Sequence, residues 1–160
     1  TRIGAMVDGI QMEQVLNYIA IGQQEGAKLL LGGKRTHTES GGFYIEPTIF
    51  DEVTPQMRIF REEIFGPVLA VTGFDTLEEA IALGNDTDYG LAAAIWTADL
   101  NKAVKGSRAL RAGTVFVNNW DGGDMPMPFG GFKQSGNGRD KSLHALEKYT
   151  ELKSTWIQLD

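Results

Sequence analysis

Apolar residues near the start of the chain recur with the period of an α-helix. Met12, Val15, Leu16 and Ile19 have the i, i+3, i+4, i+7 spacing that places side chains on one helical face. Asp8 precedes them and offers a side-chain oxygen to the free backbone N–H groups of a first turn. This pattern predicts an amphipathic helix that begins after Asp8.

Strand-like segments follow this helix. Residues 28–31 form a short apolar run, and residues 44–50 resume a strand-favouring composition after a polar stretch bounded by glycine pairs at 32–33 and 41–42. Pro47 interrupts the second run, and proline is tolerated mainly at the edges of sheets. We therefore expect an edge hairpin or a crossover in this part of the chain.

The middle of the chain alternates between apolar runs and helix signals. Thr76 and Glu79 make a capping box, and Asp99 is placed to cap a second helix. Apolar runs flank both helices, at residues 68–72, 91–97 and 114–117. Apolar strands separated by helices of this length predict a parallel sheet covered on both faces, with right-handed crossovers. The predicted fold class is therefore α/β.

The segment from residue 118 to residue 139 is the best candidate for a functional loop. Ligands of parallel sheets lie beyond the carboxyl ends of the strands, which gives weight to the loops that follow Thr72 and Val117. The second loop is long, rich in glycine and proline, and carries Trp120 and Phe129. These large aromatic residues favour a functional loop over a mobile surface loop.

The end of the chain predicts a helix followed by an isolated strand. The helix is expected around Leu143 and Leu146, and residues 151–159 have the mixed polarity of a strand. A single strand is not stable alone, so we expect it to join another sheet, in this subunit or in a neighbouring one.

Composition indicates one folded domain and limits its partners. The 160 residues are 42% hydrophobic and 22% charged, values typical of a globular protein of one domain. The formal net charge of -6 argues against nucleic acid and anionic membrane surfaces as partners. No long apolar run and no leader-like segment is present, so we expect a cytoplasmic protein, unless a targeting segment precedes the given sequence.

Cysteine and histidine are too scarce to support thiol or transition-metal chemistry. The chain has no cysteine, so it offers neither a disulfide nor a thiolate nucleophile. His37 and His144 are far apart and lack the spacing of metal-binding histidines. We therefore predict no metal site.

The stretch Glu-Glu-Ile-Phe-Gly-Pro-Val at residues 62–68 combines two carboxylates, an aromatic ring and a turn before a strand. A carboxylate accepts paired hydrogen bonds from ribose hydroxyls, and a neighbouring ring packs on a flat heterocycle. From the residues alone, a solvated turn with a core phenylalanine is the favoured interpretation.

Four blocks together resemble a known family. EEIFGPV, YGLAAAIWT, AGTVFVNN and PFGGFKQSGNGR occur in the order and spacing of aldehyde dehydrogenases, at residues 62–68, 89–97, 112–119 and 128–139. The resemblance runs from about Gly4 to Leu159. Residues 135–153 are particularly similar to γ-glutamyl-γ-aminobutyraldehyde dehydrogenases, which oxidise an amide-bearing aminoaldehyde in putrescine breakdown.

The resemblance implies a place for the chain in a larger fold. Residues 1–150 would form the C-terminal part of an aldehyde dehydrogenase catalytic domain, built on a parallel sheet of α/β type. Residues 151–160 would form a strand of the oligomerisation domain. The full-length enzyme would be a homodimer or a homotetramer.

The resemblance also implies a nicotinamide cofactor, NAD or NADP. Glu63 would hold the hydroxyls of the nicotinamide ribose, and Phe65 would contact the nicotinamide side of the cofactor. Gln11 aligns with a residue near the adenine ribose. Which of the two cofactors is preferred depends mainly on residues outside this chain.

On the substrate side, the resemblance implies that Trp120, Asp121 and Phe129 line or approach the aldehyde tunnel. Loop packing is the alternative for Trp120 and Asp121. Asp121 and Asp124 would suit a substrate with a cationic or amide nitrogen, although a solvated loop is the simpler account and ranks above it. Asp140 matches a position where relatives carry a glutamate that relays a proton, which implies a proton-relay role.

In this family a cysteine thiolate attacks the aldehyde and a glutamate activates the water that releases the carboxylic acid. Both groups would lie outside this chain, so we predict a C-terminal fragment without activity of its own. The expected substrate is an aminoaldehyde such as γ-glutamyl-γ-aminobutyraldehyde. The alternatives are a stand-alone binding or assembly module, and an acyl-forming semialdehyde dehydrogenase with a thiol acceptor.

Overall fold

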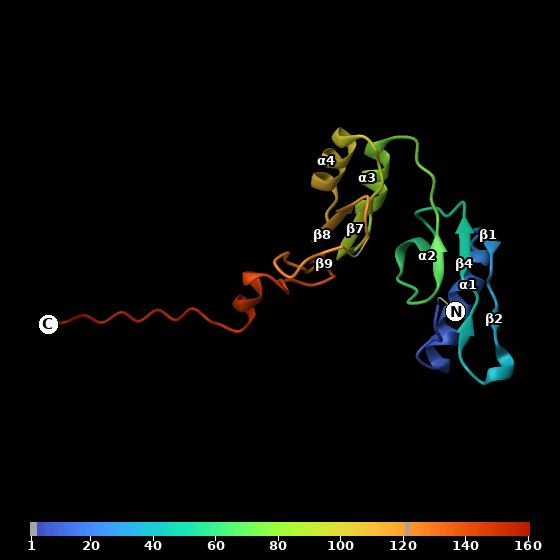
Figure 1. Ribbon diagram of the computed structural model, residues 1–160, viewed down its shortest axis with the longest axis horizontal. Helices are drawn as coiled ribbons and strands as arrows, with labels where there is room; N and C mark the ends of the chain where they lie inside the picture. The colour runs from blue at the N-terminus through green and yellow to red at the C-terminus, as the bar shows by residue number, and fades with distance from the viewer. Residues whose placement is uncertain (1–2, 121) are drawn as a thin grey trace. The chain divides into compact units, whose positions relative to one another are not determined.

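The computed structural model describes residues 3–120 and 122–160, which group into two compact units, Thr1–Phe74 and Asp75–Asp160. Figure 1 shows the helices and strands of each unit. None of the helices in the described ranges is long and apolar enough to cross a membrane.

The first unit begins with the predicted amphipathic helix. Helix α1 (Gly9–Gln24) starts after Asp8, whose carboxylate accepts a hydrogen bond from the Gln11 backbone N–H at 2.8 Å. Met12, Val15 and Ile19 on its inner face are all buried. Both the helix and its cap are therefore as the sequence predicts.

A three-stranded sheet packs beside α1 within residues 3–74. Strand β4 (Thr48–Asp51) lies in the middle, antiparallel to β1 (Lys28–Leu31) and parallel to β5 (Val68–Ala70). The edge position expected for residues 44–50 is wrong for β4. Pro47 stands directly before this strand, so its missing N–H removes no hydrogen bond from the β4 ladders.

The predicted hairpin is formed by β2 (Arg35–Thr36) and β3 (Tyr44–Ile45), which pair antiparallel. A 3-10 turn, η1 (Thr38–Ser40), lies between them. Helix α2 (Arg58–Arg61) packs against α1 and completes the unit. The hydrophobic core cluster of this unit consists of Met12, Val15, Ile19, Ala27, Ile45, Phe50, Val53, Met57, Ile59 and Ile64.

One carboxylate ties α1 to the segment that follows α2. Glu62 Oε2 accepts a hydrogen bond from the Tyr18 hydroxyl at 2.6 Å, and Arg58 donates to both carboxylate oxygens at 2.8 Å. The hydrogen bonds from Arg58, and then the one from Tyr18, lower the pKa of Glu62 to about 2. Because the Tyr18 hydroxyl donates this hydrogen bond to the Glu62 carboxylate, the pKa of Tyr18 is raised.

The second unit contains the predicted alternation of strands and helices. Thr76 caps α3 (Leu77–Asn85) through the Glu79 N–H, and Asp99 caps α4 (Leu100–Ala109) through two backbone N–H groups. Strands β7 (Ala92–Ile95) and β8 (Thr114–Val117) pair in parallel across α4, as the crossover pattern predicts. Figure 1 shows α3 and α4 next to each other, and α4 packs against both strands.

The sheet differs from the expected single row of strands. β5 belongs to the first unit and pairs with β4 there. In the second unit, the described strand partner of β7 is β8. Cover on both faces is also not observed, since the β7 residues are only half-buried and Thr114 is the one buried residue of β8. An apolar run predicts a strand, but it does not determine which other strand will pair with it.

The last part of the chain is mostly irregular. Strand β6 (Tyr89–Gly90) pairs with β9 (Phe132–Lys133), and the expected helix around Leu143 and Leu146 is the 3-10 helix η2 (Leu143–Lys148). Residues 151–160 are exposed and have no strand partner among the described residues. Their assignment to an oligomerisation strand stays a prediction.

Replacing Gly66 should destabilise the first unit. A Cβ at Gly66 would lie 2.6 and 2.7 Å from the two methyl carbons of Val15, a fully buried residue whose branched side chain has little freedom in a helix. We expect Gly66→Ala to lower the free energy of unfolding by about 1–3 kcal/mol, measured by urea denaturation. Gly73→Ala is the control, because nothing lies within 4 Å of that Cβ. Equal effects of the two substitutions would contradict the close approach.

Acid should weaken the structure through Glu62. Its pKa is lowered from 4.5 to about 2, so its stabilising effect is complete above pH 4.5 and is lost as the pH falls towards 2. We expect Glu62→Gln to be less stable than the parent chain at neutral pH, with a difference that shrinks over that interval. Urea denaturation midpoints at several pH values would measure it. Glu63→Gln is the matched control and should show no such pH-dependent difference.

Candidate functional site

The segment after α2 presents two of its side chains to solvent and turns two inward. Glu62 has extended backbone angles, and extended chains alternate the direction of successive side chains. Ile64 is buried and Glu62 is partly buried, whereas Glu63 and Phe65 are exposed. Phe65 is 69% exposed, a high value for a phenylalanine.

The two neighbouring glutamates therefore differ in their contacts. Glu62 is occupied by Tyr18 and Arg58, while no hydrogen bond or ion pair reaches the Glu63 side chain from the described residues. Only Glu63 keeps its carboxylate oxygens available for a ligand. The favoured sequence interpretation of a core phenylalanine is wrong, since Phe65 faces solvent.

Gln11 meets this segment through the backbone. Its side-chain amide donates to the carbonyl oxygen of Phe65 at 3.0 Å and to that of Ile64 at 3.4 Å. The structure thus brings together Gln11, Glu63 and Phe65, the three residues expected at the cofactor. Phe65 also has a positive φ of 54°, which residues other than glycine adopt rarely.

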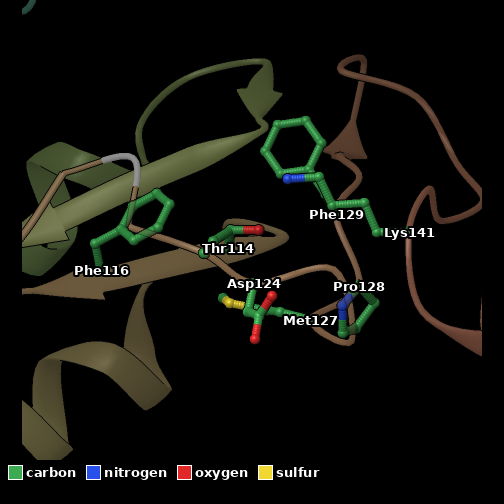
Figure 2. Close-up of a pocket in the computed structure, with 8 residues that line it drawn as sticks. Thr114, Phe116, Asp124, Met127, Pro128, Phe129 and Lys141 are labelled. Carbon is green, nitrogen blue, oxygen red and sulfur yellow. The ribbon is translucent and has the colours of Figure 1, made fainter.

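The second unit contains a cavity of about 210 Å³ beside β8 (Figure 2). Phe129, expected at the aldehyde tunnel, lines it. The described residues that line it are Thr114, Phe116, Gly123, Asp124, Met127, Pro128, Phe129 and Lys141. Trp120 is not part of this lining, but its ring packs on Phe116 with centroids 5.6 Å apart. Asp121 lies outside the described residues.

A buried hydroxyl and two charged side chains give this mostly apolar cavity its polarity. Thr114 is 3% exposed, and its Oγ1 has no hydrogen-bond partner among the described residues. Figure 2 shows this oxygen directed into the cavity, with Lys141 extending below the Phe129 ring. Asp124 adds a carboxylate. Thr114 was not among the site residues predicted from the sequence, because a threonine within an apolar strand looks like any other β-branched residue.

Asp140 is held beside Phe129. The two residues form an isolated antiparallel bridge, with N–H to O=C distances of 2.6 and 2.9 Å. The Asp140 carboxylate accepts a hydrogen bond from Lys148 Nζ at 2.5 Å. The long loop is thus closed at its base by backbone pairing, and the carboxylate expected to relay a proton lies in an exposed ion pair.

Comparison with known proteins gives consistent matches. Residues 1–155 match the Aldehyde dehydrogenase family. The chain is 53% identical, over its whole length and 32% of the relative, to the NADP/NAD-dependent aldehyde dehydrogenase PuuC of Escherichia coli. Because this is about a third of the length, the relatives contain much that is not in the present chain.

Two solved structures show the same fold. An indole-3-acetaldehyde dehydrogenase of P. syringae in complex with NAD+ is 67% identical, with a TM-score of 0.94, over 99% of this chain and 32% of that one. A γ-glutamyl-γ-aminobutyraldehyde dehydrogenase of Burkholderia cenocepacia is 64% identical, with a TM-score of 0.90, over 96% of this chain and 31% of that one. The chain therefore belongs to the aldehyde dehydrogenase family and corresponds to about one third of its relatives' length.

Proposed function

We propose that this chain is part of an NAD(P)-dependent aldehyde dehydrogenase that oxidises an aldehyde to a carboxylic acid. The observation that carries the proposal is the family match over residues 1–155 in a chain without cysteine. The family's chemistry needs a thiolate nucleophile, so that group and the glutamate base belong to sequence outside this chain. We expect the complete enzyme to be a cytoplasmic homodimer or homotetramer.

In this proposal Glu63 and Phe65 form one side of the cofactor site. The Glu63 carboxylate accepts hydrogen bonds from the nicotinamide ribose hydroxyls, and the exposed Phe65 ring packs on the nicotinamide side. The bound nicotinamide supplies the hydride acceptor. These two side chains fix the orientation of the nicotinamide. Neither makes a hydrogen bond or an ion pair with the described residues that would compete with the cofactor.

The cavity beside Phe129 forms part of the aldehyde site in this proposal. Its aromatic and methionine side chains exclude water from the substrate, while the Thr114 hydroxyl and the Asp124 carboxylate accept hydrogen bonds from an amine or amide nitrogen. Trp120 adjoins this cavity through its contact with Phe116, and Asp140 takes part in proton transfer. The family resemblance also assigns Asp121 to the substrate side. The substrate class we propose is an aminoaldehyde such as γ-glutamyl-γ-aminobutyraldehyde.

Relatives support this substrate class without selecting it. The aminoacetaldehyde dehydrogenase of Pseudomonas aeruginosa is 50% identical to the chain. Yet the indole-3-acetaldehyde enzyme is as similar in structure as the γ-glutamyl-γ-aminobutyraldehyde enzyme. An unpaired buried hydroxyl favours a substrate that forms hydrogen bonds over a purely aromatic one.

The isolated chain of 160 residues should not oxidise aldehydes. Without cysteine it cannot form the covalent hemithioacetal from which hydride leaves. We expect no NADH absorbance after mixing the purified chain with NAD+ and an aldehyde, whereas the longer protein that contains this sequence should produce it. Turnover by the isolated chain would refute the assignment of the nucleophile to other sequence. Release of a thioester product instead of a carboxylic acid by the longer protein, with a thiol acceptor present, would identify an acyl-forming enzyme.

Thr114 should set the preference for nitrogen-bearing substrates. In the longer protein we expect higher kcat/KM for γ-glutamyl-γ-aminobutyraldehyde than for an aliphatic aldehyde of similar length. Thr114→Val should reduce this preference by about tenfold, because the only buried hydroxyl lining the described cavity is removed. Thr114→Ser retains the hydroxyl and should restore it. An unchanged ratio of the two kcat/KM values in Thr114→Val would contradict the proposed role.

A further inference from the structure

One face of helix α1 contacts residues 62–66, the segment that carries the proposed cofactor residues Glu63 and Phe65. Gln11, Val15 and Tyr18 have i, i+4, i+7 spacing, so they share a helical face. Gln11 donates to the carbonyl of Phe65, Val15 packs where Gly66 has no side chain, and Tyr18 donates to the Glu62 carboxylate. Three successive turns of one helix thus hold residues 62–66 along their length.

Helix α2 holds the same carboxylate from a second side. Arg58 makes a two-point contact with Glu62, at 2.8 Å to each oxygen, and its guanidinium lies 5.4 Å from the centre of the Tyr18 ring. A planar guanidinium that binds both oxygens fixes the orientation of a carboxylate as well as its position. The Glu62 side chain is therefore restrained by three hydrogen bonds from two helices.

The other end of the segment needs a restraint of its own. Phe65 has a φ of 54°, in the left-handed region that phenylalanine rarely adopts. Such a conformation persists only when surrounding contacts impose it. The Gln11 amide on the Phe65 carbonyl and the buried Ile64 side chain are the contacts that do so here.

We propose that Gln11, Tyr18 and Arg58 are positioning residues, which fix the outward direction of Glu63 and Phe65 and so set the affinity for the dinucleotide cofactor. This rests on the proposed cofactor role of Glu63 and Phe65. In this proposal Gln11 does not contact the adenine ribose. Its amide N–H groups donate to the backbone carbonyls of Ile64 and Phe65 instead.

The positioning contacts act on binding rather than on chemistry. A carboxylate that accepts hydrogen bonds from two ribose hydroxyls must be held to within about 0.5 Å and 10–20° of the productive geometry. If Glu63 becomes mobile, the bound and reacting states lose the same interaction, so affinity falls while the chemical step is unchanged. The expected signature is a weaker cofactor complex at constant kcat.

The test uses the longer protein that contains this sequence. We expect Tyr18→Phe and Gln11→Met each to raise the Kd for NAD+ about three- to tenfold, the effect of one lost hydrogen bond, with kcat and the KM for aldehyde nearly unchanged. Titration calorimetry measures the Kd without turnover. Tyr44→Phe and Gln14→Met are the matched controls, because Tyr44 belongs to β3 and Gln14 is an exposed residue of α1. Both controls should bind NAD+ as the parent does.

A double-mutant cycle separates positioning from general weakening. If Tyr18 acts through Glu63, then adding Tyr18→Phe to Glu63→Ala should raise the Kd no further than Glu63→Ala alone. Multiplied effects, or equal effects of Tyr18→Phe and Tyr44→Phe, would overturn the positioning proposal. If Glu63→Ala itself leaves the Kd unchanged, the proposed cofactor site is what fails. A rise for Glu63→Ala with none for Tyr18→Phe refutes only the positioning role.

Discussion

The hydrogen-bonded contact between the Glu62 carboxylate, Tyr18 and Arg58 is the constraint on which the first unit's site depends. It joins two helices to a segment that has almost no regular structure of its own. Glu62 and Ile64 are held by the protein, and burial alternates along residues 62–65, so Glu63 and Phe65 face solvent. An exposed carboxylate and an exposed ring are thus consequences of how their neighbours are bound.

The second unit organises its site in a different way. Its described residues contribute little to the hydrophobic core, and its strands β7 and β8 are mostly half-buried. The cavity instead relies on the backbone bridge between Phe129 and Asp140, which closes the base of the long loop beside β8. A cavity wall made by a loop can be adapted to different substrates, because loop side chains can be substituted without disrupting the strands beneath. Similar identity to enzymes named for indole and aminoaldehyde substrates agrees with this.

Family membership and the features of the site support each other at different levels. The match over nearly the whole chain establishes what fold these residues adopt, and the share of about one third states how much of each relative they represent. The role of a particular side chain follows from its own contacts. Gln11 illustrates the difference, since its amide is engaged by the carbonyls of Ile64 and Phe65.

Local patterns were sufficient for the elements and their ends: the period of Met12 and Val15 predicts α1, and the Asp8, Thr76 and Asp99 caps are all observed. They also located the segments that carry the candidate sites. Strand partners, the division of labour between Glu62 and Glu63, and the unpaired hydroxyl of Thr114 required the folded structure. Helix period and capping depend on residues within a few positions of each other, whereas pairing, burial and hydrogen-bond satisfaction depend on groups that folding brings together from distant parts of the chain.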